Sequence, residues 1–206
     1  MPKKEAPLSY LDNYLPAGAS EKVLEYLHRY QVHLTITRSR KSILGDYRHA
    51  TGSDNHRISV NGSLNKYAFL ITLIHEVGHL ITFQQYANRV NSHGREWKLA
   101  YRKVLEDFLH LKLFPTDLHQ ALLKSLHDLP ASSCSDVNLT RVLKKYDVRD
   151  KTILVEDIPE GALFKTSDGK IFKRGRQIRK RIECPELRTG KLYLFSPVYE
   201  VEPVYT

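Results

Sequence analysis

The sequence predicts an α+β protein made of a larger first part and a small β-rich second part. Residues 66–85 form a long apolar run of helical length, and short segments rich in β-branched residues precede it. After about residue 150, short β-branched or aromatic runs alternate with turn residues, which is typical of a small antiparallel sheet. The length of 206 residues suits one domain, or one domain with a small appendage.

The first part begins with a predicted helix over residues 20–30 (SEKVLEYLHRY). Ser20 is the expected N-cap, and Val23, Leu24 and Leu27 share one face. Three segments rich in β-branched residues follow, and the polar turn ATGSDN between the second and the third indicates a hairpin or meander. The predicted strands cover 32–38, 43–49 and 56–61.

Helices dominate the rest of the first part. We predict one over 66–85, one over 95–111 and one that starts at Thr116, after Pro115. The segment LPASSCSD (129–136) is the clearest change of composition, and it precedes a last short helix. The predicted organisation is a domain over 1–130, a linker with a short helix over 131–149 and a basic β-rich tail over 150–206.

Composition favours a cytoplasmic protein with a polyanionic partner. Lys and Arg number 32 against 23 acidic residues, which gives a formal net charge of +9. Two cysteines, Cys134 and Cys184, do not make a disulfide framework, and we expect ordinary thiols. The N-terminal segment lacks the apolar stretch of a secretory signal. Polar residues interrupt the longest apolar run, so we expect no membrane span and no membrane partner.

The polar residues inside that apolar run form the motif HEVGH. His75 and His79 are four residues apart, so on a helix their side chains lie one above the other and suit one Zn²⁺ ion. Glu76 lies beside the metal position rather than on it, as a general base requires. A buried glutamate is costly unless something pairs with it, and a metal site supplies that pairing. For Gly78 we expect close packing against a neighbouring backbone.

Two histidines are too few for a catalytic zinc site, which usually has three protein ligands. The metzincin pattern fails, because Thr82 and Gln85 stand where it requires glycine and histidine. The next candidates lie in NSHGREW: His93, which follows a loop long enough to reverse the chain, and Glu96, one turn into the next helix. On the residues alone, His93 is favoured over Glu96 as the third ligand.

The pair of segments HEVGH (75–79) and HGREW (93–97) resembles the SprT family of zinc metalloproteases, which includes the Spartan proteases. LGDYR and HRISVN are also similar to the strands ahead of that family's active helix, so the resemblance covers about residues 20–110. It implies a zincin-like domain, one zinc ion per chain on His75, His79 and His93, and Glu76 as the catalytic base. Trp97 takes the family's aromatic position and is expected to be structural.

The resemblance further implies a zinc-dependent endopeptidase that uses a metal-activated water. The best understood members cleave proteins crosslinked to DNA, with DNA as activator, so we expect protein substrates and a DNA partner. We also expect the strand HRISVN to pair with an extended substrate. Two alternatives stay open: a zinc-containing nucleic-acid-binding module without catalysis, and a regulatory protease that cuts one specific repressor. The sequence sets no oligomeric state.

The tail departs from the family. Many SprT-like proteins end in a zinc ribbon with two pairs of cysteines, whereas Cys184 stands alone here. We favour a degenerate ribbon-like sheet over an unrelated small β module. The run KIFKRGRQIRKR (170–181) is either a solvated hairpin or a surface for nucleic-acid phosphates; Phe172 and Ile178 are interleaved in it, so we expect some side chains to pack inward while the charges face out. Its seven basic residues are Lys170, Lys173, Arg174, Arg176, Arg179, Lys180 and Arg181.

Overall fold

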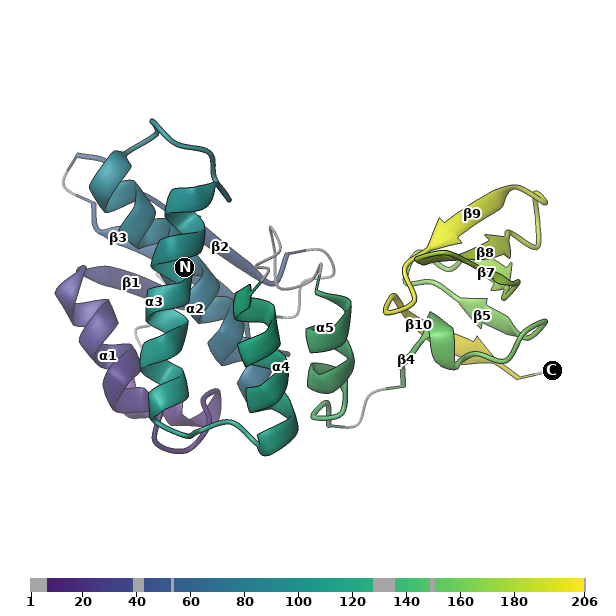
Figure 1. Cartoon of the computed structure of the whole chain (residues 1–206), viewed down its shortest axis with the longest axis horizontal. Coiled ribbons are helices and arrows are strands. Elements are labelled where there is room, and N and C mark those ends of the chain that lie inside the picture. The colour runs from purple at the N-terminus through teal and green to yellow at the C-terminus, as the bar shows by residue number, and fades with distance from the viewer. Residues whose placement is uncertain (1–6, 39–42, 53, 128–135, 149–150, 206) are drawn as a thin grey trace. The chain divides into compact units, whose positions relative to one another are not determined.

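A computed structural model describes residues 7–38, 43–52, 54–127, 136–148 and 151–205. The chain divides into two compact units, Met1–Tyr146 and Asp147–Thr206 (Figure 1). The described residues form five α-helices and three small sheets, so the α+β class expected from the sequence is confirmed.

The first unit contains one three-stranded sheet, made of β1 (Val32–Thr37), β2 (Gly45–Arg48) and β3 (His56–Asn61). β2 and β3 pair antiparallel, as the predicted hairpin requires, while β1 pairs parallel to β3. The strand order is therefore β1-β3-β2, and β3 lies in the centre. The expectation that HRISVN pairs with a substrate is wrong, because a strand paired on both sides has no free backbone edge to offer.

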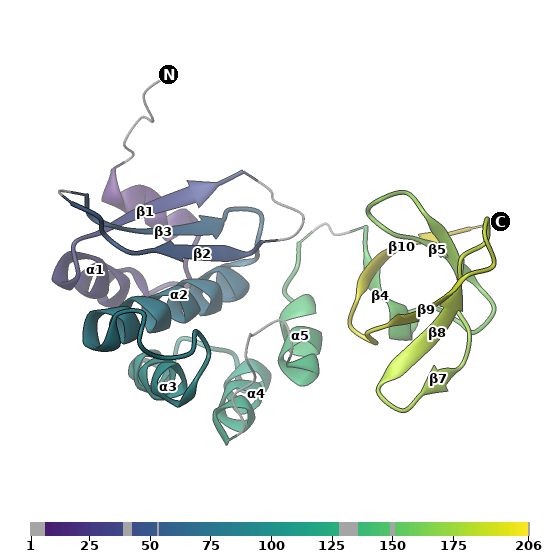
Figure 2. The same ribbon diagram turned by 90° about the horizontal axis from the view of Figure 1, so that it is seen from above.

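Helices cover one face of this sheet. α2 lies directly beneath the strands and α3 packs on the opposite side of α2 (Figure 2). This position explains why α2 is apolar on every side, because a helix enclosed between two layers has little surface facing water. The helical elements are η1 (Leu8–Asn13), α1 (Ser20–Arg29), α2 (Lys66–Tyr86), α3 (Arg95–His110), α4 (Thr116–His127) and α5 (Val137–Lys144).

Two local features set the position of α2. The Asn65 side chain caps its N-terminus by accepting hydrogen bonds from the backbone N–H groups of Tyr67 and Ala68, at 3.1 and 2.9 Å. Further along, a Cβ atom on Gly78 would lie 3.1 Å from Nε1 of Trp97 and 3.2 Å from Cβ of Tyr101. The glycine thus lets α3 approach closely, as expected from the sequence.

The short helix α5 packs on the first unit. Leu139 is buried in the core of that unit, and the Leu143 carbonyl accepts a hydrogen bond of 3.1 Å from the Asn65 side chain. Just beyond the helix, the hydroxyl of Tyr146 donates to Asp117 in α4 at 2.6 Å. These contacts make α5 part of the same compact unit as the sheet and α2.

The second unit is built from short antiparallel strands around an aromatic core. Its two sheets have the orders β4-β10-β5-β6 and β7-β8-β9. Phe164, Phe172, Ile182 and Cys184 are buried between them, with no more than 2% of any of these residues exposed. Cys184 is therefore a buried free thiol, while Cys134 lies outside the described residues. The elements are β4 (Ile153–Leu154), η3 (Val155–Asp157), β5 (Leu163–Lys165), β6 (Ile171–Lys173), β7 (Gln177–Ile178), β8 (Arg181–Pro185), β9 (Leu192–Phe195) and β10 (Glu200–Val204).

Candidate metal centre

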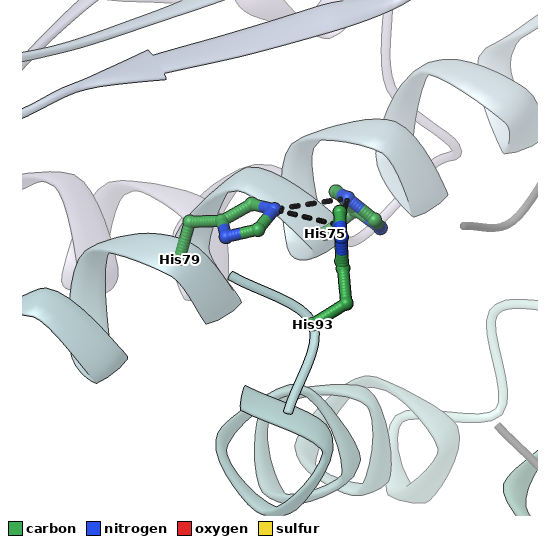
Figure 3. Close-up of side chains that lie close together, drawn as sticks. All are labelled: His75, His79 and His93. Carbon is green, nitrogen blue, oxygen red and sulfur yellow. Dashed lines mark hydrogen bonds between the residues drawn. The ribbon is translucent and has the colours of Figure 1, made fainter. Parts of the chain in front are cut away.

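Three histidine side chains meet between α2 and the loop that precedes α3 (Figure 3). His75 and His79 project from α2 one turn apart, and His93 reaches them from the loop, next to the Gly94 N-cap of α3. The Nε2 atoms lie 3.2 Å apart for His75 and His79, 3.1 Å for His79 and His93, and 3.2 Å for His93 and His75. Each ring therefore directs the same nitrogen toward one point.

Hydrogen bonding alone does not account for this triangle. The Nε2 atom of a neutral histidine either donates or accepts, so among three mutually close Nε2 atoms at least one pair has matching roles and repels. A cation at the centre would instead accept a lone pair from all three. Tetrahedral zinc with ligand nitrogens at 2.0–2.1 Å places those nitrogens roughly 3.3–3.4 Å apart. The separations found here fit that geometry, so the donor set suits a zinc ion.

Electrostatics keep the three rings in the form that binds a metal. Burial, together with the neighbouring His79 and His93, lowers the pKa of His75 to about 3. Burial and His93 lower the pKa of His79 to about 4, and burial also lowers the pKa of His93. At neutral pH the rings are therefore uncharged with their lone pairs available. Nδ1 of His75 is buried and has no hydrogen-bond partner in the described part of the chain.

The indole ring of Trp97 forms one wall of the site. It lies 4.7, 5.3 and 4.8 Å from the rings of His75, His79 and His93, measured between ring centroids. It also stacks on Tyr101 at 5.1 Å with an interplanar angle of 9°. Only 1% of Trp97 is exposed, so this residue holds the histidine rings in place and excludes water from behind them.

The two carboxylates near the motif differ in position. Glu76 is buried in α2, with 6% of its surface exposed, and its carboxylate lies against Gly45 of β2. Glu96 does not join the histidines: in the described ranges, the group able to hold a metal consists of His75, His79 and His93. The structure thus brings His93 rather than Glu96 to the two motif histidines.

A family model described as the SprT-like family matches residues 15–119, which is just over half of the 206 residues. This chain belongs to the SprT-like family. Residues 15–119 accordingly form a metalloprotease-like domain, and they include the three converging histidines and Glu76. Neither a curated protein nor a solved structure matches the chain. In the described ranges, no helix of this SprT-like protein combines the length and apolarity needed to cross a membrane.

The basic run of the tail does not form one hairpin. It crosses from β6 in one sheet to β7 and β8 in the other. Of the two apolar residues interleaved in the run, Phe172 is buried, as expected for some of its side chains, whereas 36% of Ile178 is exposed. β7 is a two-residue edge strand, and it has too little sheet beside it to cover that side chain.

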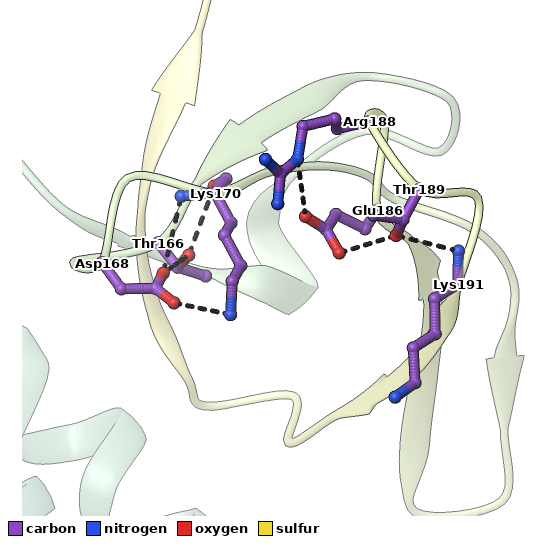
Figure 4. Close-up of polar contacts among 7 residues, drawn as sticks. All are labelled: Thr166, Asp168, Lys170, Glu186, Arg188, Thr189 and Lys191. Atoms are coloured by element: carbon purple, nitrogen blue, oxygen red, sulfur yellow. Dashed lines mark hydrogen bonds and ion pairs between the residues drawn. The ribbon is translucent and has the colours of Figure 1, made fainter.

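Acidic residues outside the run pair with three of its seven basic side chains. Lys170 pairs with Asp168 at 3.0 Å (Figure 4). The other two pairs join Arg174 to Glu160 and Arg176 to Glu183, each at 3.3 Å. The four basic residues of the run outside these pairs are exposed: Lys173, Arg179, Lys180 and Arg181.

Positive charge is also unequally divided between the two units. Met1–Tyr146 has 20 Lys and Arg against 13 acidic residues, a net of +7, while Asp147–Thr206 has 12 against 10, a net of +2. Most of the positive excess therefore belongs to the unit with the histidine site, which the sequence reasoning about the tail overlooked. Counting charges separately for the two parts would have found it.

The turns of the tail that follow β5 and β8 are held by polar side chains. Thr166 donates to Asp168 and to the carbonyl of Lys170, and Thr189 donates to the buried carboxylate of Glu186 at 2.7 Å (Figure 4). In the described residues of this unit, no cluster of metal-ligand side chains occurs. Hydrogen bonds and the aromatic core therefore stabilise these turns.

Proposed function

We propose that this SprT-like chain is a zinc-dependent endopeptidase of the zincin type that acts on DNA-associated or DNA-crosslinked proteins. The supporting observation is the convergence of three neutral imidazole Nε2 atoms, separated by 3.1–3.2 Å, beside a buried glutamate. His75, His79 and His93 would hold the zinc ion. This set leaves a fourth position open, as catalytic zinc sites do and structural ones do not.

The chain's own residues divide the remaining work. A zinc ion bound there would supply Lewis acidity, polarising a water molecule and the scissile carbonyl. Glu76 accepts a proton from the attacking water and later delivers it to the leaving amine. The histidines contribute lone pairs and stay neutral, because their burial disfavours protonation. Trp97 holds the three rings in the orientation that this arrangement needs.

The substrate would align along β2. In the described chain, β2 is an edge strand of the sheet, and Gly45 places it against Glu76. An extended peptide that pairs with this edge would have its backbone fixed by hydrogen bonds independent of its side chains, which suits a protease with varied protein substrates.

The proposed DNA partner rests on charge. The net +7 of the first unit and the exposed residues Lys173, Arg179, Lys180 and Arg181 of the tail offer contacts to phosphates. Such contacts would bring the protease to proteins bound on DNA without reading a sequence.

The test is the Glu76→Gln variant beside the wild type, assayed on an unfolded protein with and without single-stranded DNA. We expect the variant to keep its zinc and its fold and to lose turnover by at least a hundredfold. Equal rates would favour the binding module without catalysis. Wild-type cleavage that ignores DNA and is confined to one protein would favour a regulatory protease.

A further inference from the structure

We propose that Gly45 is a positioning residue that fixes the place of the Glu76 carboxylate. A Cβ atom built on Gly45 would lie 2.5 Å from Oε1 of Glu76, 2.9 Å from its Cγ and 2.7 Å from Cγ2 of Thr72. Carbon atoms in folded proteins do not approach that closely. The carboxylate thus occupies the space that any other residue at position 45 would fill. This inference rests on the proposed role of Glu76 as the base.

Space, rather than backbone conformation, requires the glycine. The φ angle of Gly45 is not positive, so the left-handed backbone conformation that usually requires a glycine does not explain this one. Glycine inside a strand is unfavourable and often marks a close approach to another group. In β2 that group is Glu76, since two of the three atoms nearest to the absent Cβ belong to it.

The surroundings leave Glu76 little room to yield. The residue is 6% exposed, and Thr72, one turn earlier on α2, is 5% exposed. A Cβ on residue 45 would press on Cγ as well as on the carboxylate, so rotation of the terminal torsion alone does not relieve the contact. Either the carboxylate moves to another rotamer or β2 shifts away from α2. A displacement of about 1 Å at a catalytic group can cost on the order of a hundredfold in rate.

The primary variant is Gly45→Ala, and Gly62→Ala is its matched control. Gly62 follows β3 and also lacks positive φ, and its added Cβ would meet Ile36 at 2.8 Å and the Thr37 carbonyl at 3.0 Å, with no atom of Glu76 among its nearest neighbours. Both variants should lose thermal stability. We expect only Gly45→Ala to lower kcat, by about 10–100-fold, with KM and zinc content close to wild type.

Two further variants separate positioning from general crowding. Thr72→Ser in the Gly45→Ala background removes one of the crowded atoms, and should recover stability without recovering kcat. Glu76→Asp withdraws the carboxylate from β2. If Gly45 acts through Glu76, adding Gly45→Ala to Glu76→Asp should lower kcat by no more than about twofold relative to Glu76→Asp alone, because the effects of coupled residues are not additive.

The outcomes are distinct. Wild-type kcat in a folded Gly45→Ala protein, full rescue by Thr72→Ser, or multiplying effects of Gly45→Ala and Glu76→Asp would each overturn the positioning role. If Gly45→Ala alone does not fold, Gly45→Ala combined with Thr72→Ser, which removes one of the crowded atoms, is compared with Thr72→Ser alone, and an unchanged kcat would overturn the positioning role. An active Glu76→Gln enzyme would instead refute the proposed function itself, whatever Gly45→Ala does.

Discussion

Nε2 of His93 lies 3.1 Å from Nε2 of His79, although the two histidines are fourteen positions apart in the sequence. One belongs to a helix and the other to the loop before the next helix, so tertiary packing of α2 against α3 creates their contact. The site therefore depends on the approach of two elements as well as on the spacing of one motif.

The first prediction concerns zinc content. Purified protein should carry about one zinc per chain, and His75→Ala, His79→Ala or His93→Ala should each lose most of it, because two ligands bind zinc far more weakly than three. Glu96→Ala is the matched control and should retain zinc. The measurement is elemental analysis after gel filtration. Zinc retained by His93→Ala and lost by Glu96→Ala would refute the ligand assignment.

The second prediction uses the single tryptophan of the chain. The Trp97 ring lies 4.7–5.3 Å from all three histidine rings, so its environment changes when they bind a metal. Adding zinc to the chelated protein should alter the tryptophan emission in a saturable manner, with an endpoint at one equivalent. In His93→Ala, the zinc concentration that gives half of the emission change should be at least tenfold higher. If the protein binds zinc and its tryptophan emission does not change, the placement of Trp97 beside the three metal-binding histidines is contradicted.

The third prediction is the pH dependence of the zinc-free protein. Burial lowers the pKa of His75 to about 3 and that of His79 to about 4. Below pH 6.5 the unfolded chain takes up protons that the folded chain does not, so the free energy of unfolding should fall as the pH falls from 6.5 toward 4. Each histidine contributes a limiting slope of about 1.4 kcal/mol per pH unit.

Urea unfolding at a series of pH values measures this slope, with a His75→Asn and His79→Asn double variant for comparison. The double variant should lose stability less steeply over the same range, since the two titrating rings are absent. Parallel curves for the two proteins would show that these histidines are not buried in neutral form.

The fourth prediction concerns the tail. Replacing Lys173, Arg179, Lys180 and Arg181 with Gln should weaken DNA binding and flatten the plot of log K against log[salt] by about 0.7–0.9 for each lost phosphate contact. A matched variant with Gln at Arg174 and Arg176 should change the slope less, because these side chains pair with Glu160 and Glu183. Salt titrations on single- and double-stranded DNA test both. Identical slopes for all proteins would place the DNA contacts on the first unit.

Periodicity and turn signals predicted most elements of the fold. The apolar run of α2, the amphipathic pattern of α3 and the β2–β3 turn are local properties, and each was found close to its expected bounds. The order of the strands was not predictable in this way. β1 pairs in parallel with β3 through contacts between residues far apart in the sequence, and nothing in the strand segments themselves specifies which one lies in the centre.

The candidate site shows the same division. The spacing of His75 and His79 is a helical property and is readable from sequence, whereas the residues alone only favoured His93 over Glu96 as the third ligand, and the family resemblance strengthened that choice. The crowding between Gly45 and Glu76 had no sequence signal, because it joins two residues 31 positions apart through tertiary packing. The partners of Arg174 and Arg176 likewise lie outside the basic run, so the run alone overstated its free charge.

The loop between the second and third histidines gives a zinc ion a further role. Because His79 and His93 belong to separate elements, an ion held by both would link the two ends of the segment between them, as a disulfide would, and removing the ion would release that link. In a protein without a disulfide framework, closing a loop of about 15 residues in this way restricts the unfolded chain by as much as ~3 kcal/mol. Metal supply would then set how long the folded protein survives, and scarcity would expose the segment before α3 to other proteases.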